Sequence, residues 1–501
     1  MGQAIPKKLR EKIESKQTNR PLVLAAVMLA MFMAAIEATI VATAMPAIVG
    51  DLGGFSLYSW VFSSYLLMNA VTVLIYGKLS DLFGRKPILI FGIIVFLIGS
   101  ILSGFATSMK LLILFRFIQG FGAGAVMPIA STIVGDMYNK EERAKIQGYL
   151  SSVWGISAIM GPALGGVFVE FVSWRLVFWI NVPLGILAII VLVLFLHEGI
   201  EKKKHSIDLL GAILLFIAIS AIMFVLVEGG VRFSWTSPTV LSLVTISLIA
   251  FVCFVWQEKR VQNPMMPFSI WKEKSIFIAN LTSLTTGIML IGISSFLPAF
   301  VQGVMERSPI VAGFTLTTMS IGWPIASTVA GRLLLKIGFR TTSLIGGVAL
   351  IIGSVIFVTL SPDDGPLWAA FASFMVGIGM GMTTTSFIVS IQSTVEWQMR
   401  GVATAANMFM RTLGSTIGAA LLGGILNSKL QSYIQSEGIE NVSLESTNIL
   451  LNEQERNALS ESVRSILQEG LTISLHYVYL GVFVFAAISF LLIIFLPKGQ
   501  R

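Results

Sequence analysis

The chain has 501 residues, of which 55% are hydrophobic and only 12% are charged, and its formal net charge is +8. Soluble domains carry roughly 25% charged residues, so this composition excludes a string of soluble domains and indicates a protein whose solvent is lipid. The basic residues lie in short segments between apolar stretches, which excludes a nucleic-acid-binding face, and one cysteine, Cys253, excludes a disulfide framework within the chain.

The chain begins with a basic and polar segment, residues 1–21, which we expect to lie in the cytoplasm. The apolar stretch after Arg20 is too long for the core of a signal peptide, and no small-residue cleavage site closes it. We therefore expect this stretch to be retained as the first membrane helix.

Apolar stretches of membrane-spanning length follow one another along the whole chain. A spanning helix needs about 20 mostly apolar residues, and the alternating pattern of barrel strands is absent. The sequence therefore predicts an all-α polytopic membrane protein with fourteen spans. The predicted spans are 22–46, 57–77, 87–107, 110–135, 147–170, 175–196, 208–228, 238–257, 276–300, 309–331, 340–360, 366–391, 401–426 and 471–497.

The distribution of the basic residues predicts the orientation. With a cytoplasmic N-terminus and fourteen spans, most of the 34 Lys and Arg residues fall in cytoplasmic segments, as the positive-inside rule requires. We expect a multi-pass protein of the plasma membrane with both termini in the cytoplasm. The one long loop, 427–470, is acidic and is placed outside; residues 452–469 could form a short polar helix, but a solvated loop is favoured.

The two ends of the chain repeat each other. Segment 77–84 (GKLSDLFG) recurs 254 residues later as 331–338 (GRLLLKIG), and the glycines at 120, 122 and 124 recur 257 residues later at 377, 379 and 381. This offset predicts a six-helix bundle at 22–196, a linker with two inserted helices at 197–275, and a second six-helix bundle at 276–501 that contains the 427–470 loop. Repeats of this kind are typical of transporters that rock around a central site.

Two groups of residues are candidates for conformational roles. The first is a cytoplasmic gating loop, in which glycines allow a tight turn and charged side chains can form a latch; a loop that only sets topology is the alternative. Its residues are Gly77, Asp81, Gly84, Arg85, Lys86 and Asp136. The second is a small-residue stretch in the fifth span that suits close packing, a gate, or both. Its residues are Gly155, Gly161, Pro162, Gly165 and Gly166.

These stretches resemble the motifs of a known family. Segment 77–86 (GKLSDLFGRK) is similar to the signature loop of the major facilitator superfamily, and 116–124 (RFIQGFGAG) to its fourth-helix motif. Segment 155–166 (GISAIMGPALGG) is similar to its antiporter motif. Segment 174–185 (WRLVFWINVPLG), and Asn407 with 411–414 (RTLG), resemble the fourteen-span drug/proton antiporters. The chain departs from this pattern at Glu37, where the family usually has Asp, and at Leu335, the repeat's counterpart of Asp81.

The resemblance implies export of amphipathic, often cationic small molecules in exchange for protons, by alternating access. The chain would then be no enzyme, would use no cofactor beyond the proton gradient and no metal, and would act on small-molecule cargo and protons in the lipid bilayer. We expect a monomer that binds no nucleic acid. Export of one endogenous metabolite, signalling nucleotide or lipid is the alternative, and a membrane sensor without transport is less favoured.

A few polar residues within the spans are candidates for proton coupling and cargo contact. Glu37 lies about sixteen residues into the first span, where a charge is costly unless it faces a cavity or a partner. A carboxylate that binds either a proton or a cation can make the two compete, although a structural hydrogen bond is the alternative. The complete set is Glu37, Arg116, Arg411, Asn407 and Glu228.

Overall fold

The structure is a computed structural model that describes residues 18–138, 140–198, 208–261, 264, 266, 268–395, 400–437, 443–451 and 453–497. Most of these residues are helical. The α-helices are α2 (Arg20–Leu52), α3 (Tyr58–Phe83), α4 (Arg85–Gly104), α5 (Met109–Met137), α6 (Lys140–Phe171), α7 (Leu176–Trp179), α8 (Asn181–Phe195), α9 (Leu209–Glu228), α10 (Pro238–Arg260), α11 (Lys274–Ala299), α12 (Pro309–Thr359), α13 (Pro366–Thr394), α14 (Arg400–Glu437), α15 (Glu453–Ala458) and α16 (Glu461–Ile494). Short 3-10 and π segments are η1 (Phe55–Leu57), η2 (Phe268–Lys272), η3 (Phe300–Val304), η4 (Pro362–Asp364) and η6 (Leu444–Leu451).

Fourteen helical segments cross the length of the bundle. Within the described residues, 11 helices are long and apolar enough to cross a membrane. One of them, α12, covers two predicted spans and changes direction at Gly338, whose φ is 79°. Helices α3 and α6, with 26 and 32 residues, are also long enough to cross the bundle. The predicted all-α architecture of fourteen transmembrane helices is therefore confirmed.

Local sequence signals explain several helix boundaries. Ser308 accepts a hydrogen bond from the Val311 amide and is followed by proline, which is a strong start signal for α12. Gly84 separates α3 from α4 with φ 95°, and Gly338 has the corresponding position in the second half. A positive φ favours glycine, so the turn explains why both copies of the repeated segment end in this residue.

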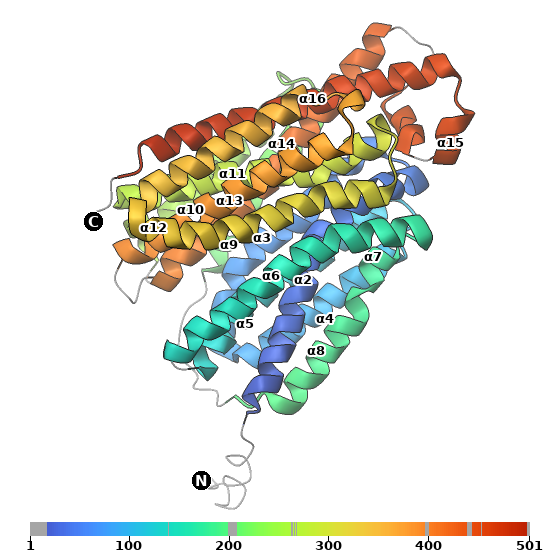
Figure 1. The fold of residues 1–501 in the computed structure, drawn as a ribbon. Helices are drawn as coiled ribbons and strands as arrows, with labels where there is room; N and C mark the ends of the chain where they lie inside the picture. The colour runs from blue at the N-terminus through green and yellow to red at the C-terminus, as the bar shows by residue number, and fades with distance from the viewer. Residues whose placement is uncertain are drawn as a thin grey trace, which may run out of the picture.

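The repeat is visible in how the helices pack. A methyl group added at Gly122 would overlap the backbone of α4 at Gly92 and Phe96. Its counterpart Gly379 lies 2.8 Å, measured from such a methyl group, from the carbonyl oxygen of Gly346 on the second part of α12. Gly92 and Gly346 are themselves 254 residues apart, so the same close helix contact is built twice. In Figure 1 the first bundle runs from blue to green and the second from yellow to red, side by side.

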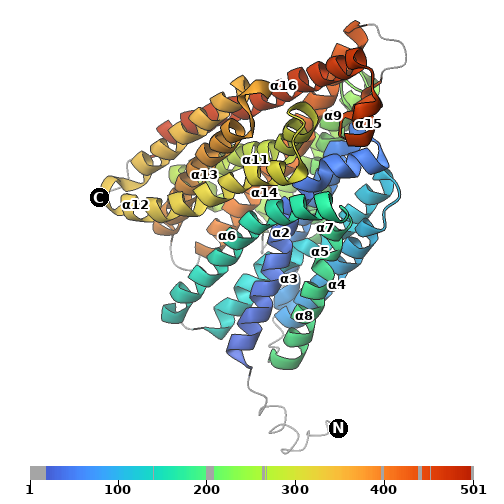
Figure 2. The ribbon, with the colours of Figure 1, turned by 45° about the vertical axis from the view of Figure 1, so that its right-hand side comes forward.

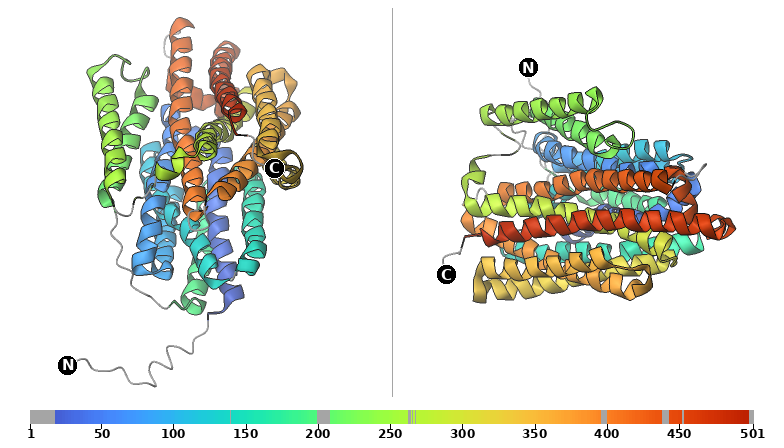
Figure 3. Two further views of the ribbon diagram at one scale, coloured as in Figure 1. Left: turned by 90° about the vertical axis from the view of Figure 1, so that its left-hand side faces the viewer. Right: turned by 90° about the horizontal axis from the view of Figure 1, so that it is seen from above.

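The two inserted helices, α9 and α10, form a pair at one side of the bundles (Figure 3). Helix α9 packs against both α3 of the first bundle and α14 of the second, whereas α10 packs mainly on α9. The pair therefore covers the seam between the bundles, which confirms the predicted arrangement of two six-helix bundles plus two inserted helices.

The bundles meet tightly at one end, opposite both termini (Figure 2). We call it the capped end because residues 443–451 and 453–459 lie over it. The Tyr58 hydroxyl donates to the Ser295 carbonyl over 2.6 Å, and the Gln302 amide donates to the Thr43 carbonyl over 3.2 Å. The hydrogen bonds between described residues of the two bundles lie in the half of the molecule nearer this end. At the opposite, terminal end, Leu335 is 90% exposed.

The segment predicted as a solvated loop at 427–470 differs from that expectation. Helix α14 continues to Glu437 and α16 begins at Glu461, so the connection is shorter than predicted. The Phe55 amide donates to the Asn448 side chain over 3.0 Å, and Arg456 is buried with its guanidinium on the Gln302 carbonyl at 3.1 Å. The sequence did not predict this docking, because acidic residues dominate the composition of the segment and outweigh its buried Leu450 and Leu451.

Candidate functional site

A buried ion pair lies at the centre of the first bundle. Glu37 on α2 is 0% exposed, and one of its carboxylate oxygens accepts a hydrogen bond from the guanidinium of Arg116 on α5. Its other oxygen accepts from the Asn181 side chain on α8 over 2.7 Å. Each oxygen of the carboxylate therefore has a partner on a different helix.

The guanidinium of Arg116 is held by several groups besides the carboxylate. Its side chain is 2% exposed, its Nε donates to the Val61 carbonyl on α3 over 3.3 Å, and its terminal nitrogen donates to Gln119 Oε1 over 2.8 Å. The Tyr65 ring lies 4.2 Å from the guanidinium carbon, in cation–π range. A permanent charge inside the bundle thus has one charged and several neutral partners.

Amide and hydroxyl side chains extend this network to a fifth helix. Ser100 on α4 accepts hydrogen bonds from Asn181 over 3.0 Å and from Gln119 over 3.2 Å, and its hydroxyl donates to the Phe178 carbonyl over 2.7 Å. Gln119 and Asn181 lie inside the motifs at 116–124 and 174–185, but they were not among the predicted site residues. Polar side chains in otherwise apolar helices were the available signal. We call Glu37, Ser100, Arg116, Gln119 and Asn181 the first-bundle network.

The two candidate residues of the second bundle, Asn407 and Arg411, make different contacts. Asn407 on α14 donates to the Asn280 side chain over 3.0 Å and to Ser283 over 2.8 Å, so it joins α14 to α11. Arg411, one turn further on, makes no ion pair with a described residue, and its guanidinium lies 5.8 Å from the ring of Trp323 on α12. The structure therefore gives the two arginines of the spans unlike surroundings.

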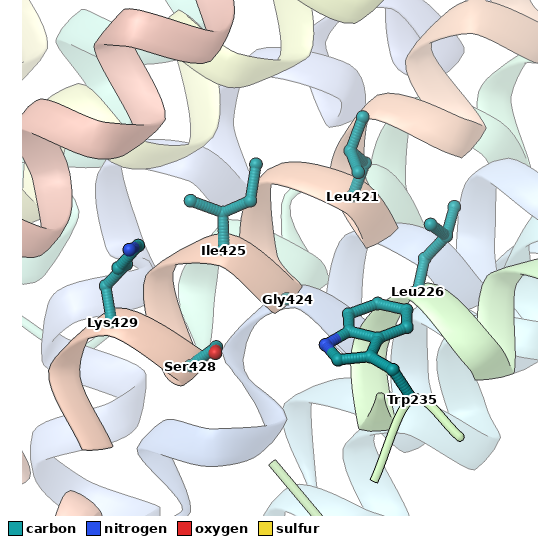
Figure 4. A pocket seen from close by; sticks show the side chains of 7 residues that line it. All are labelled: Leu226, Trp235, Leu421, Gly424, Ile425, Ser428 and Lys429. Atoms are coloured by element: carbon teal, nitrogen blue, oxygen red, sulfur yellow. The ribbon is translucent and has the colours of Figure 1, made fainter. Parts of the chain in front are cut away.

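Glu228 lies at the end of α9, where its carboxylate accepts a hydrogen bond from the Trp60 indole over 3.0 Å. A small pocket of about 110 Å³ lies nearby, between α9 and α14 (Figure 4). Its lining residues are Leu226, Trp235, Leu421, Gly424, Ile425, Ser428 and Lys429. Glu228 does not line this pocket, and its hydrogen bond joins the inserted pair to α3.

The cytoplasmic gating loop forms part of a charged cluster at the terminal end. Arg85 pairs with Asp136 over 3.0 Å, and Glu198 accepts hydrogen bonds from the backbone amides of Arg85 and Lys86, both over 2.9 Å. Lys86 also donates to the Leu196 carbonyl over 2.6 Å. Glu198 was missed because it follows the sixth span, far from the motif in sequence. Gly77 lies within α3, and the side chain of Asp81 lies outside the described residues.

The small residues of α6 pack on two sides. A methyl group at Gly161 would overlap the Thr39 side chain on α2, and one at Gly165 would lie 2.8 Å from the Ile40 carbonyl. On the other side, a methyl group at Gly166 would lie 2.8 Å from the Ile310 backbone on α12, and one at Gly313 of α12 would overlap the Pro162 carbonyl. Gly155, nearer the terminal end, has only Pro324 within reach, at 3.6 Å. Helix α6 thus joins both bundles closely in its half nearer the capped end.

Among the side chains that the structure describes, no group of three or more His, Cys, Asp or Glu comes together as metal ligands. The prediction that the protein uses no metal or cofactor stays a prediction.

Comparison with known proteins identifies the family. The model of the Major Facilitator Superfamily matches residues 27–419. Multidrug resistance protein 3 of Bacillus subtilis is 33% identical over 495 residues, covering 97% of each chain. The multidrug transporter protein MdtP of the same organism is 34% identical over 420 residues, covering 83% of this chain and 77% of the relative. These names point to a transporter rather than an enzyme.

Solved structures give the same fold. A bacterial homologue of the human lysosomal transporter Spinster, in an inward-facing and unoccupied conformation, superimposes with a TM-score of 0.70 at 17% identity, covering 96% of this chain and 98% of the other. The nucleoside transporter NupG, in a variant form, gives a TM-score of 0.59 at 14% identity, with 92% and 100% covered. Sequence, fold and helix arrangement agree, and the chain belongs to the major facilitator superfamily of membrane transporters.

Proposed function

We propose that this protein exports amphipathic small molecules across the plasma membrane in exchange for protons, and that Glu37 is the proton-binding group. The observation that carries the proposal is the buried pair of Glu37 and Arg116 in the first-bundle network. The names of two relatives, a multidrug resistance protein and a multidrug transporter, support small-molecule export.

The network has two distinct ionic states. When Glu37 is ionised, its charge and that of Arg116 compensate each other in a low-dielectric site, where the attraction is strong. When Glu37 takes up a proton, Arg116 keeps its charge and retains only neutral partners, the Val61 carbonyl and Gln119. Proton binding therefore loosens the link between α2 and α5 and leaves one uncompensated positive charge.

Helix α2 can carry this change to the second bundle. The Thr43 carbonyl, six residues after Glu37, accepts the hydrogen bond from Gln302, and α2 also packs against the small residues of α6. A rigid helix that holds the proton site at one position and the interface at another couples the two events. Proton binding would thereby shift the balance between a state closed at the capped end and a state closed at the terminal end.

The charged cluster at the terminal end supplies a candidate latch for the second state. Arg85, Asp136 and Glu198 hold the start of α4 against the ends of α5 and α8 within the first bundle. We propose that this cluster positions the gating loop when the bundles close at that end. The positive-inside rule places this end in the cytoplasm, which makes the capped end extracellular.

Proteoliposomes with an entrapped pH indicator test the proposal. A cargo concentration that is higher inside the liposomes than outside should drive protons inward. We expect this for at least one of a lipophilic cation, an aromatic acid and a zwitterion. Glu37→Gln should abolish proton movement while purified protein still elutes as a folded species. Glu273→Gln, which alters an exposed carboxylate just before α11, is the matched control and should leave exchange intact. Cargo-driven proton flux that survives Glu37→Gln would refute the assignment of Glu37.

A further inference from the structure

Arg411 is a charged side chain within the membrane-spanning part of α14, and it has no charged partner among the described residues. It lies eleven residues after the start of α14, whose first residue is Arg400. A guanidinium keeps its proton in proteins, so this site remains cationic. Arg116, the other arginine within the spans, is compensated by Glu37, so Arg411 carries the unbalanced charge.

The aromatic neighbour of Arg411 is Trp323 on α12. Pro324, the next residue on α12, is the nearest neighbour of Gly155 on the first bundle, at 3.6 Å from an added methyl group. This stretch of α12 therefore faces the first bundle. Helices α12 and α14 do not pack along each other, yet Arg411 on α14 approaches the Trp323 ring on α12 to 5.8 Å.

Both side chains are accessible although they lie far from the helix ends. Arg411 and Trp323 are partly exposed, and the Trp323 indole N–H makes no hydrogen bond with a described residue. A guanidinium facing hydrocarbon would be strongly unfavourable, so we expect this side chain to face the protein interior rather than the lipid. The two groups thus offer a cation and an N–H donor that have no hydrogen-bond partner among the described residues.

Away from the helix ends, the described residues offer a positively charged cargo no free carboxylate. Glu37 is the described carboxylate that lies away from the helix ends, and it is fully enclosed and bonded to Arg116 and Asn181. The described charges within the spans therefore sum to a positive centre, which attracts anions and repels cations.

We propose that Arg411 and Trp323 form an anion subsite of the central cavity, and that the exported compounds are amphipathic aromatic acids or zwitterions. The guanidinium binds a carboxylate or sulfonate through two parallel hydrogen bonds, the indole N–H donates a third, and the indole face stacks on the aromatic part of the cargo. This inference rests on the proposed export function and separates its two tasks: the proton binds in the first bundle and the acidic group of the cargo in the second.

A pair of probes that differ only in charge tests the subsite. Purified protein in lipid nanodiscs is titrated with pyrenebutyrate and with its uncharged carboxamide, and energy transfer from tryptophan to pyrene reports binding. Wild-type protein should bind the carboxylate at least tenfold more tightly than the amide, and ethidium, a cation, more weakly than either. Arg411→Gln should remove most of the preference for the carboxylate, whereas Arg411→Lys, which keeps the charge but loses the planar fork, should keep part of it.

The control variant is Arg232→Gln. Arg232 is also stacked near an aromatic ring, Phe233 at 5.5 Å, but it is exposed on the connection between α9 and α10. It should leave the ratio of carboxylate to amide affinity unchanged. Trp323→Phe keeps an aromatic face and removes the N–H, so it should reduce carboxylate binding more than amide binding.

The outcomes separate this inference from the proposed function. Equal wild-type affinity for carboxylate and amide, or a loss of both probes in equal measure in both Arg411 variants, overturns the anion subsite even if proton exchange persists. A carboxylate preference that depends on Arg411, in a protein that exchanges no protons for any cargo, retains the subsite and overturns proton-coupled export.

Discussion

Replacing the two members of the buried pair, singly and together, should have strongly non-additive effects on stability. Glu37→Leu leaves the Arg116 guanidinium enclosed, with the Val61 carbonyl and Gln119 as its remaining hydrogen-bond acceptors. Breaking a buried pair by removing one partner costs about 3–5 kcal/mol, because an uncompensated charge stays behind. Arginine cannot neutralise itself, so we expect Glu37→Leu to lie within that range.

Arg116→Met should cost less than Glu37→Leu. The carboxyl group that remains can take up a proton, and as a neutral group it keeps the hydrogen bond from Asn181. The penalty then resembles that of a weakened buried hydrogen-bond network, about 1–3 kcal/mol. The asymmetry follows from one chemical difference: a buried carboxylate has a neutral form available at ordinary pH and a guanidinium does not.

The double variant Glu37→Leu/Arg116→Met should be more stable than Glu37→Leu alone. Replacement of a whole buried ion pair by apolar side chains is often close to neutral, so the two single losses almost cancel in the double variant and the interaction energy between the two sites is about 4–8 kcal/mol. SDS titration in mixed micelles, followed by tryptophan fluorescence, measures all three free energies of unfolding. Additive losses would refute the reasoning, because they would mean that the two charges do not compensate each other. The double variant should also lack proton-driven exchange, which separates the stability of the pair from its proposed use.

Three further predictions concern the two ends of the bundle. The hydrogen bond from Arg464 holds the pKa of the Glu306 carboxyl below its ordinary value of 4.5, so its stabilisation of the capped end is present above that value and is lost as the pH falls through the lowered pKa. Protease cleavage within 443–459 should rise as the pH falls from about 4.5 to about 3 in wild-type protein, and Glu306→Gln should remove much of this dependence. Gly313→Leu should force the Pro162 backbone away and open the capped end, read as increased labelling of cysteines introduced there in a Cys253→Ser background; unchanged labelling would contradict the packing argument. Glu198→Gln should weaken its hold on the first amides of α4 and cost about 1–2 kcal/mol, measured by the same SDS titration; a stability equal to wild type would count against it.

The helices and their pairing were predictable because they depend on local composition and on a repeat. Hydropathy predicted fourteen spans, and the repeated glycines at 122 and 379 lie where neighbouring helices approach closely. These signals need no knowledge of distant neighbours, since a stretch of about 20 apolar residues has few alternatives in lipid. The change of direction at Gly338 agrees with the predicted break between the spans 309–331 and 340–360, and the first copy of the segment also ends in a glycine, at 84.

The partners within the site were not predictable from the same signals. Glu37 and Arg116 were each selected as costly intramembrane charges, but they lie 79 residues apart and their pairing depends on how α2 and α5 rotate about their axes. A rotation of one residue position, about 100°, would direct either side chain elsewhere. Glu198 and Arg456 were missed for a related reason: each lies at a helix end, where charged residues are ordinarily solvated.

The two bundles share their packing but not their charges. The position 257 residues after Arg116 is Ser373, and the position 257 residues before Arg411 is Trp154, so neither charged residue has a charged counterpart in the other copy. A transporter that rocks two rigid bundles requires only one of them to sense protons, provided that both share an interface that changes with the rocking. Helix α2 meets that requirement, because Glu37 and the Thr43 carbonyl bonded to Gln302 lie about 9 Å apart along its axis. On this argument the cargo need not touch Glu37 at all, and the second bundle is free to select it by a charge of its own.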